Sequence, residues 1–220
     1  MADLVIFGAG EIAELAHFYF ERDSAHRPVA FTVDSAYLKE VSFHGLPVVA
    51  FEEIAAAFPP NAHQAFVALS YAKVNALRAA KCQAMEEAGF ALASYVSSHA
   101  TVFDGFAPGA NAFILEDNTI QPFARVGRNV TMWSGNHIGH HSVIEDDVFI
   151  TSHVVVSGGV RVGRRCFLGV NATLRDHIAI GERCVIGAGA LLLSDAEPEG
   201  VYMGTASERS RVPSSRLRGI

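Results

Sequence analysis

The chain has 220 residues, of which 50% are hydrophobic and 18% are charged, a composition that supplies a core and excludes intrinsic disorder. Its formal net charge of −6 leaves no basic excess for binding nucleic-acid phosphates. Its apolar runs, such as residues 190–193, are too short to cross a bilayer, so we expect neither a nucleic-acid nor a membrane partner.

Residues 1–96 alternate short apolar runs with segments of helical periodicity. We predict strands at residues 4–7, 29–33, 47–49 and 66–69, and helices at residues 11–20, 52–58 and 73–88. Alternation at this pitch is typical of a small parallel sheet with helices on its faces. The first part of the chain is therefore predicted to be an α/β, Rossmann-like domain.

A glycine-rich turn, Gly8-Ala9-Gly10, follows the first predicted strand and opens the first predicted helix. Glycines at this place allow a diphosphate to approach the main-chain N–H groups of a helix N-terminus. Asp34 follows the second strand, where a carboxylate can bond a ribose hydroxyl. Taken alone, the GxGxxA pattern is compatible with an NAD site or with a turn that serves only packing.

From residue 114 to residue 192 every sixth residue is aliphatic, through fourteen consecutive positions. Glycine often follows the aliphatic residue. This hexapeptide repeat predicts a parallel β-helix in which three hexads make one triangular coil, so residues 18 apart stack about 4.8 Å apart on successive coils. We assign the β-helix to residues 97–195 and a C-terminal tail to residues 196–220.

The repeat also sorts the turn residues onto the three edges of the β-helix. The residues two positions after each aliphatic one form three sets: Arg128, Asp146, Arg164 and Glu182; Ser134, Ser152, Val170 and Ala188; and His140, Gly158 and Asp176. The first set is a ladder of alternating charge, which we interpret as structural. Only the third set combines residues that are suited to a catalytic site.

Residues 133–158, WSGNHIGHHSVIEDDVFITSHVVVSG, resemble the hexapeptide-repeat sugar acyltransferases, a family that includes sialic acid O-acetyltransferases and bacillosamine and perosamine N-acetyltransferases. The resemblance covers essentially the whole chain. It implies an N-terminal nucleotide-binding βαβ domain, a left-handed β-helix, assembly as a homotrimer, and acetyl-CoA or a longer acyl-CoA as co-substrate. It implies N-acylation of a nucleotide-linked amino-dideoxy sugar for surface polysaccharide such as O-antigen, with sugar O-acetylation as the close alternative.

The resemblance also implies catalytic roles. His140 matches the family's catalytic base, and Gly158 supplies the backbone N–H that holds the thioester oxygen. The register agrees independently, because Gly158 stacks on His140. His141 stands where many members carry an acidic residue that orients the base. Asp176 and a carboxylate from a neighbouring subunit are the other candidates for that role. Phe149 replaces a second histidine that some members have.

Two sets of binding residues follow from the resemblance. The nucleotide sugar is expected to contact Gly8, Gly10, Glu11, Asp34, Ser70 and Tyr71. The acyl-CoA is expected to contact His153, Gly158, Asn171, Gly189 and Arg209. Ile12 stands where some relatives have a histidine that meets the sugar.

Two hypotheses from other classes remain open at this point. The five histidines between residues 137 and 177 are compatible with a trimeric β-helix zinc enzyme, although we expect no metal. The second hypothesis is a non-catalytic module that binds nucleotide sugars.

The three cysteines (Cys82, Cys166 and Cys184) lack CxxC spacing, and the start lacks a charged leader. Both features favour a reduced, cytoplasmic chain.

Overall fold

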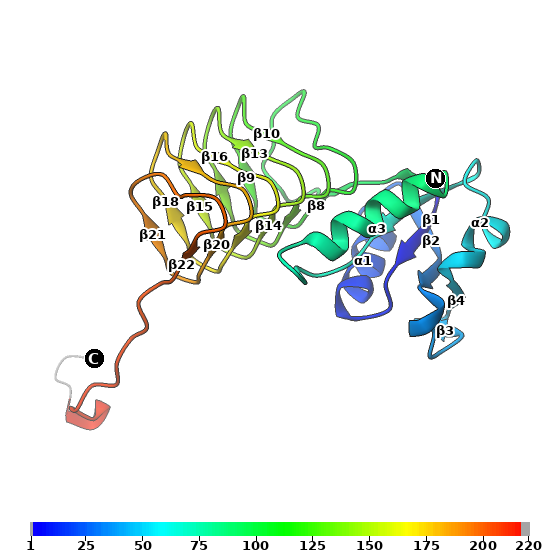
Figure 1. Ribbon diagram of the computed structural model, residues 1–220, viewed down its shortest axis with the longest axis horizontal. Coiled ribbons are helices and arrows are strands. Elements are labelled where there is room, and N and C mark those ends of the chain that lie inside the picture. Colours follow the sequence, from blue (N-terminus) through cyan, green and yellow to red (C-terminus); the bar gives the residue numbers. More distant parts are fainter. Residues whose placement is uncertain (1, 217–220) are drawn as a thin grey trace.

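The computed structural model describes residues 2–216, which form two units joined end to end (Figure 1). The first unit, here called the head, is a six-stranded sheet in the order β3-β4-β2-β1-β5-β6. Its pairings are parallel except for the β3–β4 hairpin. Its elements are β1 (Ala2–Phe7), α1 (Glu11–Arg22), β2 (His26–Val33), β3 (Ser42–Phe43), β4 (Leu46–Ala50), α2 (Ile54–Ala57), β5 (His63–Val67), α3 (Ala76–Glu87) and β6 (Ala91–Leu92).

The predicted strand–helix alternation of the head is confirmed, with differences at the element ends. The predicted helix 52–58 is a 3₁₀ turn, Phe51–Glu53, followed by the single α-helical turn of α2. The fourth predicted strand begins earlier, because His63 and Gln64 extend β5 beyond its apolar part. In α1, Ala13, Ala16 and Phe20 are buried at helical spacing and pack with the sheet residues.

The second unit is a left-handed β-helix of two-residue strands (Figure 1). Its seven-stranded sheet contains β7 (Tyr95–Val96), β8 (Phe113–Ile114), β11 (Thr131–Met132), β14 (Phe149–Ile150), β17 (Phe167–Leu168), β20 (Val185–Ile186) and β22 (Val201–Tyr202). The five-stranded sheet contains β9 (Thr119–Ile120), β12 (His137–Ile138), β15 (Val155–Val156), β18 (Thr173–Leu174) and β21 (Leu191–Leu192). The four-stranded sheet contains β10 (Arg125–Val126), β13 (Val143–Ile144), β16 (Arg161–Val162) and β19 (Ala179–Ile180).

The predicted register of the β-helix is confirmed. Strands pair in parallel at an offset of 18 residues, except for the last pair, β20–β22, so that Ile150 lies between Met132 and Leu168. All fourteen aliphatic positions of the repeat are buried in one continuous core. Because side chains alternate across a strand, the first residue of each two-residue strand points outward and the second points inward.

Each corner of the β-helix holds one residue with positive φ, again every six residues. The non-glycine corner residues are Asn111, Asp117, Phe123, Asn129, His141, Asp147, His153, Arg165, Asn171, His177 and Arg183. Asn, Asp and His are the side chains that tolerate this left-handed conformation best. The corner conformation therefore gives a structural reason for several of the histidines in the cluster.

Only two residues separate β6 of the head from β7 of the β-helix. No helix within residues 2–216 has the length and apolar character that a membrane span requires. The last four residues of the predicted tail lie outside the described residues. The first part of the predicted tail instead continues the β-helix, because Ala196 bridges to Ile180 and β22 pairs with β20. The segment that follows, residues 205–216, extends away from the β-helix (Figure 1).

Candidate active site

His140 lies in the turn after β12, at the edge where the five-stranded and four-stranded sheets meet. Two hydrogen bonds fix its backbone. Its N–H donates to Gln121 Oε1 (2.9 Å), and its carbonyl accepts from the Gly159 N–H (2.8 Å). The side chain itself is exposed, so a substrate can reach the imidazole.

The imidazole of His140 is oriented by its chain neighbour. His140 Nδ1 lies 3.1 Å from His141 Nδ1, and one nitrogen of this pair must donate while the other accepts. When His140 is the donor, its Nε2 carries no proton and is available as a base. His141 occupies a left-handed corner, and its ring lies 4.7 Å from that of Phe123. Asp176 is exposed two coils further along, so His141 is the residue in contact with the base.

Gly158 lies directly beside His140 on the next coil. A Cβ atom built on Gly158 would lie 2.8 Å from both Nε2 and Cε1 of His140. The Gly158 N–H has no acceptor among residues 2–216, whereas Arg128 and Arg164, in the same turn position, donate theirs to carboxylates. A free N–H next to an imidazole edge is the arrangement that an oxyanion donor and a general base require.

Replacing Gly158 with alanine is expected to lower kcat about 100-fold, because the added methyl group displaces the imidazole and crowds the free N–H. The backbone of Gly158 is outside the left-handed region, so alanine fits without backbone strain. Thermal unfolding should therefore resemble that of the wild type, while steady-state kinetics show the loss. An unchanged kcat would contradict the role of this N–H.

The other predicted acyl-CoA residues lie on a different edge. His153, Asn171 and Gly189, here called the His153 column, are 18 residues apart at the junction of the seven-stranded and five-stranded sheets. The ring of His153 packs over Gly135, where a Cβ would lie 2.5 Å from Nδ1. Arg209 is exposed on the extended tail (Figure 1). A single chain thus does not bring Arg209 to the His153 column.

The glycine-rich turn of the head contains two glycines with different roles. Gly8 has a φ of +126°, and a Cβ there would lie 2.8 Å from the carbonyl oxygen of Ala68, so the fold itself requires glycine. Gly10 is the N-cap of α1, is exposed, and a Cβ there would meet no described atom within 4 Å. The open side of Gly10 therefore leads to the N-terminus of a twelve-residue helix, a favourable place for a phosphate. Glu11 is exposed in the first turn of the same helix.

A cleft of about 190 Å³ lies beside this turn and is lined by Ala9, Val33, Tyr37, Lys39, Glu40, Phe43 and Val48. Asp34 follows β2 as predicted, and its Oδ1 accepts a hydrogen bond from Lys81 Nζ (2.5 Å). Ser70 and Tyr71 do not line this cleft. The ring of Tyr71 instead packs against Phe149 and Phe167 of the β-helix, with centroid distances of 5.2 and 4.8 Å.

Sequence reasoning missed Gln121 and Lys81. The 18-residue register places Gln121 below Gly139, next to His140, so the repeat contained the signal for this residue. Lys81 lies within a predicted helix, and no pattern connects it to Asp34.

Within residues 2–216, no group of three or more His, Cys, Asp or Glu side chains is arranged to hold a metal ion.

Comparison with known proteins gives the same architecture. A family model described as the hexapeptide repeat of succinyl-transferase matches residues 159–194. PerB from Caulobacter crescentus, solved with CoA and GDP-perosamine, is 22% identical with a TM-score of 0.79, covering 93% of this chain and 95% of that one. The acetyltransferase domain of PglB from Neisseria gonorrhoeae is 21% identical, with a TM-score of 0.77 and coverage of 93% and 97%.

WeeI from Acinetobacter baumannii is 15% identical, with a TM-score of 0.78 over 93% of this chain and 97% of that one. These similarities extend over head and β-helix together. The fold predicted from the repeat and the glycine-rich turn is therefore confirmed. The chain therefore has the two-part fold of these solved structures, a small α/β head followed by a left-handed β-helix, and its residues 159–194 match the hexapeptide repeat.

Proposed function

We propose that the protein transfers an acetyl group from acetyl-CoA to the amino group of a nucleotide-linked amino-dideoxy sugar. The observation that carries this proposal is the position of His140 Nε2 beside Gly158, whose N–H is free. Two structures with the same fold, each solved in complex with CoA and GDP-perosamine, support it. Sugar O-acetylation and a longer acyl donor are variants of the same chemistry.

In the proposed reaction the sugar amine attacks the carbonyl carbon of the thioester, and a C–N bond forms. His140 Nε2 accepts the proton that the amine loses. The Gly158 N–H stabilises the negative oxygen of the tetrahedral intermediate. When the C–S bond breaks, the imidazolium returns its proton to the sulfur, and the products are an amide and CoA. Because the Nδ1 partner is a histidine, His141 stabilises the imidazolium less than a carboxylate would.

The head is proposed to hold the nucleotide. Main-chain N–H groups at the start of α1 are open to a diphosphate at Gly10. The adjacent cleft has aromatic walls in Tyr37 and Phe43, against which a base can pack. Asp34 is proposed to bond the ribose, and Ser70 and Tyr71 to contact the substrate between head and β-helix.

We infer a homotrimer with acetyl-CoA bound between subunits. The five-stranded sheet separates the edge that carries His140 and Gly158 from the His153 column. Its outer face exposes apolar side chains, with Leu191 62% and Val155 37% accessible, as expected of an association surface. A closed threefold ring through this face would join the His140 edge of one copy to the His153 column of the next. An active monomer in analytical ultracentrifugation would contradict this assembly.

The compartment and pathway are also proposals. The three cysteines are free and buried, which suits a reducing compartment, and we propose the cytoplasm. An amide-forming enzyme that acts on nucleotide-linked amino sugars would supply activated precursors for a surface polysaccharide such as O-antigen.

Release of CoA tests the proposed function. The purified protein is incubated with acetyl-CoA and, in turn, with UDP-, GDP- and dTDP-linked amino-dideoxy sugars, and the free thiol is measured. We expect release that depends on one of these acceptors. If none of the acceptors in the panel causes release of CoA, and calorimetry also detects no binding of acetyl-CoA, the non-catalytic binding module would be favoured.

Gly10→Val is expected to raise the KM for the nucleotide sugar about 10-fold or more, because the side chain projects into the open space through which a diphosphate approaches the α1 N-terminus. The KM for acetyl-CoA should stay nearly unchanged, since that ligand binds to the β-helix. Steady-state kinetics with each substrate varied in turn measure both values. An equal rise in both would mean that the turn serves folding.

A further inference from the structure

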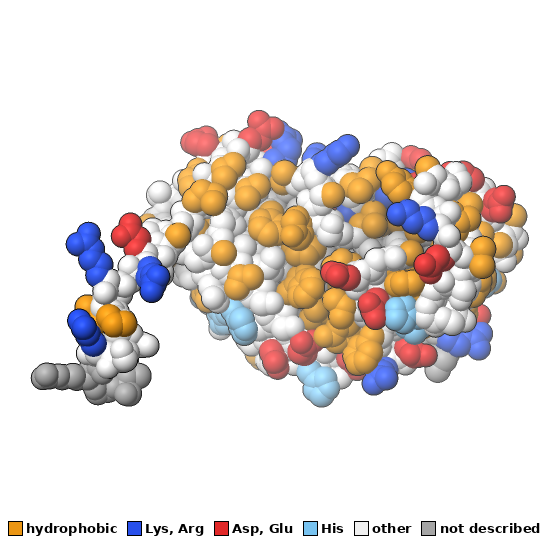
Figure 2. All heavy atoms as spheres, turned by 90° about the horizontal axis from the view of Figure 1, so that it is seen from below, with side chains coloured by type: hydrophobic (Ala, Val, Ile, Leu, Met, Phe, Trp, Pro, Cys, Tyr) orange, Lys and Arg blue, Asp and Glu red, His pale blue; other side chains and the backbone are white. Residues whose placement is uncertain are grey.

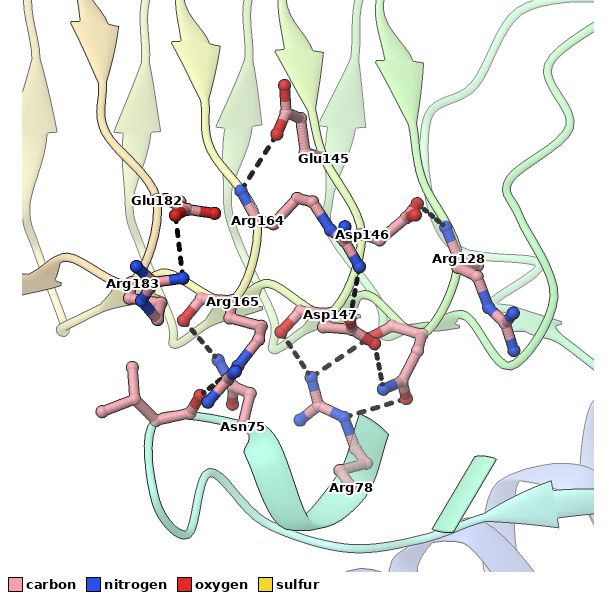
Figure 3. A network of polar contacts seen from close by, with 12 residues as sticks. Asn75, Arg78, Arg128, Glu145, Asp146, Asp147, Arg164, Arg165, Glu182 and Arg183 are labelled. Carbon is pink, nitrogen blue, oxygen red and sulfur yellow. Dashed lines mark hydrogen bonds and ion pairs between the residues drawn. The ribbon is translucent and has the colours of Figure 1, made fainter. Parts of the chain in front are cut away.

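The buried guanidinium of Arg78 joins the head to the β-helix. Arg78 lies on α3, is 1% exposed, and points into the corner between the four-stranded and seven-stranded sheets (Figure 3). Its Nε donates to Asn129 Oδ1 (3.0 Å), and its Nη2 donates to the carbonyl oxygens of Asn129, Asp147 and Val148 (3.0, 3.2 and 3.2 Å). One side chain of the head therefore binds two successive coils.

The corner that receives Arg78 is itself built as a polar ladder. Asn111 Nδ2 donates to Asn129 Oδ1 (2.9 Å), and Asn129 Nδ2 donates to Asp147 Oδ1 (2.8 Å). At the head end of the ladder, Asn111 also binds the backbone N–H and carbonyl of Val67, at the end of β5 (2.7 and 3.2 Å). The ladder thus continues from the β-helix corner to the edge of the head sheet.

The loop before α3 is fixed to the same corner in an unusual conformation. Lys73, Val74 and Asn75 all have positive φ, between 49° and 63°, which is costly for a β-branched residue. The β-helix holds this turn, because Asn75 Nδ2 donates to the carbonyls of Arg165 and Cys166 (3.2 and 2.9 Å) and Arg165 Nε donates to the Val74 carbonyl (3.3 Å) (Figure 3).

Residues 73–75, Arg78 and the polar ladder that they contact are here called the joint. The joint lies close to the proposed substrate site, because it begins two residues after Tyr71, and Tyr71 is one of the residues proposed to contact the nucleotide sugar. Burial lowers the pKa of Arg78 to about 10, so the guanidinium remains charged at neutral pH. Removing a buried, charge-assisted network of this kind frees the head to move against the β-helix.

Resting on the proposed function, we propose that Arg78 is a positioning residue for acyl transfer. It holds the head rigidly on the β-helix. The amine of a sugar that is anchored through its nucleotide is then placed beside the His140 imidazole, which accepts its proton. Anchoring raises the reaction rate only when the bound geometry is fixed, and a shift of about 1 Å can cost roughly 100-fold. An acceptor that the head does not hold gains nothing from this rigidity.

The test compares two acceptors in the Arg78→Met variant: the nucleotide-linked amino sugar and the methyl glycoside of the same amino sugar. We expect kcat for the nucleotide-linked acceptor to fall about 10–100-fold, while kcat/KM for the methyl glycoside stays within about twofold. Calorimetric affinities for acetyl-CoA and for the free nucleoside diphosphate should also stay within about twofold.

Arg128→Met is the matched control. Arg128 Nη2 also joins the β-helix to α3, through Glu86 Oε2 (2.6 Å), but this ion pair is exposed and contributes little. Its kinetics should match the wild type. Arg78→Lys keeps the charge without the planar fork, and should show a smaller loss confined to the nucleotide-linked acceptor, which keeps the test valid if the methionine variant does not fold.

Equal losses on both acceptors, or no loss on either, would overturn the positioning role of Arg78. A wild-type protein that acetylates neither acceptor would instead contradict the proposed function, and that result is obtained before any variant is compared.

Discussion

Replacing His140 with asparagine is expected to lower kcat about 10²–10⁴-fold and to change KM little. Asparagine keeps part of the size and hydrogen bonding of histidine, but it cannot accept the proton that the attacking amine loses. The loss should therefore affect the chemical step and leave binding largely intact. Steady-state kinetics of the variant at pH 7, with each substrate saturating in turn, measure both parameters.

The same variant separates amine from hydroxyl acceptors. A sugar amine whose pKa is near neutrality becomes a free nucleophile as the pH rises, so activity of His140→Asn should partly recover toward pH 9. A hydroxyl acceptor gains no such recovery, because its pKa lies far above this range. His177→Asn is a suitable control, since His177 occupies a left-handed corner that asparagine tolerates. Wild-type kcat in His140→Asn would move the assignment of the base to His141.

Ile150→Asp is expected to destabilise the fold by several kcal/mol. Ile150 is fully buried between Met132 and Leu168 in the β-helix core, and a carboxylate there has no partner. Ala179→Asp is the control, because residue 179 is an exposed, outward-pointing strand position and should change stability by about 0.5 kcal/mol or less. Urea unfolding followed by circular dichroism compares the two. A fully stable Ile150→Asp protein would mean that the register is wrong.

The β-helix could be predicted almost residue by residue because its geometry is local and periodic. Each position is tied to neighbours six and 18 residues away, so the repeat alone predicts that Ile150 is buried and that Gly158 lies beside His140. The conformation of the corners was not predicted. Because the corners are left-handed, His141, His153 and His177 have a structural reason to be there, which His140 does not share.

The joint between the units could not be predicted in the same way. Arg78 lies in a predicted helix, where an arginine is ordinarily exposed, and its partners are 51 to 70 residues away. Likewise, the position of Tyr71 against the β-helix depends on how the head docks. The surface of the described molecule (Figure 2) also exposes many apolar side chains, and their arrangement on this face likewise depends on the three-dimensional fold.

We propose that this protein forms an amide on a nucleotide-linked amino sugar. Tandem mass spectrometry of the product formed with acetyl-CoA tests it most directly, since fragmentation locates the added acetyl group on the sugar. We expect a single acetyl group on the sugar nitrogen, formed by the wild type and nearly lost in His140→Asn at pH 7. An acetyl group on a sugar oxygen, or an unmodified amino sugar across the acceptors tested, would contradict it.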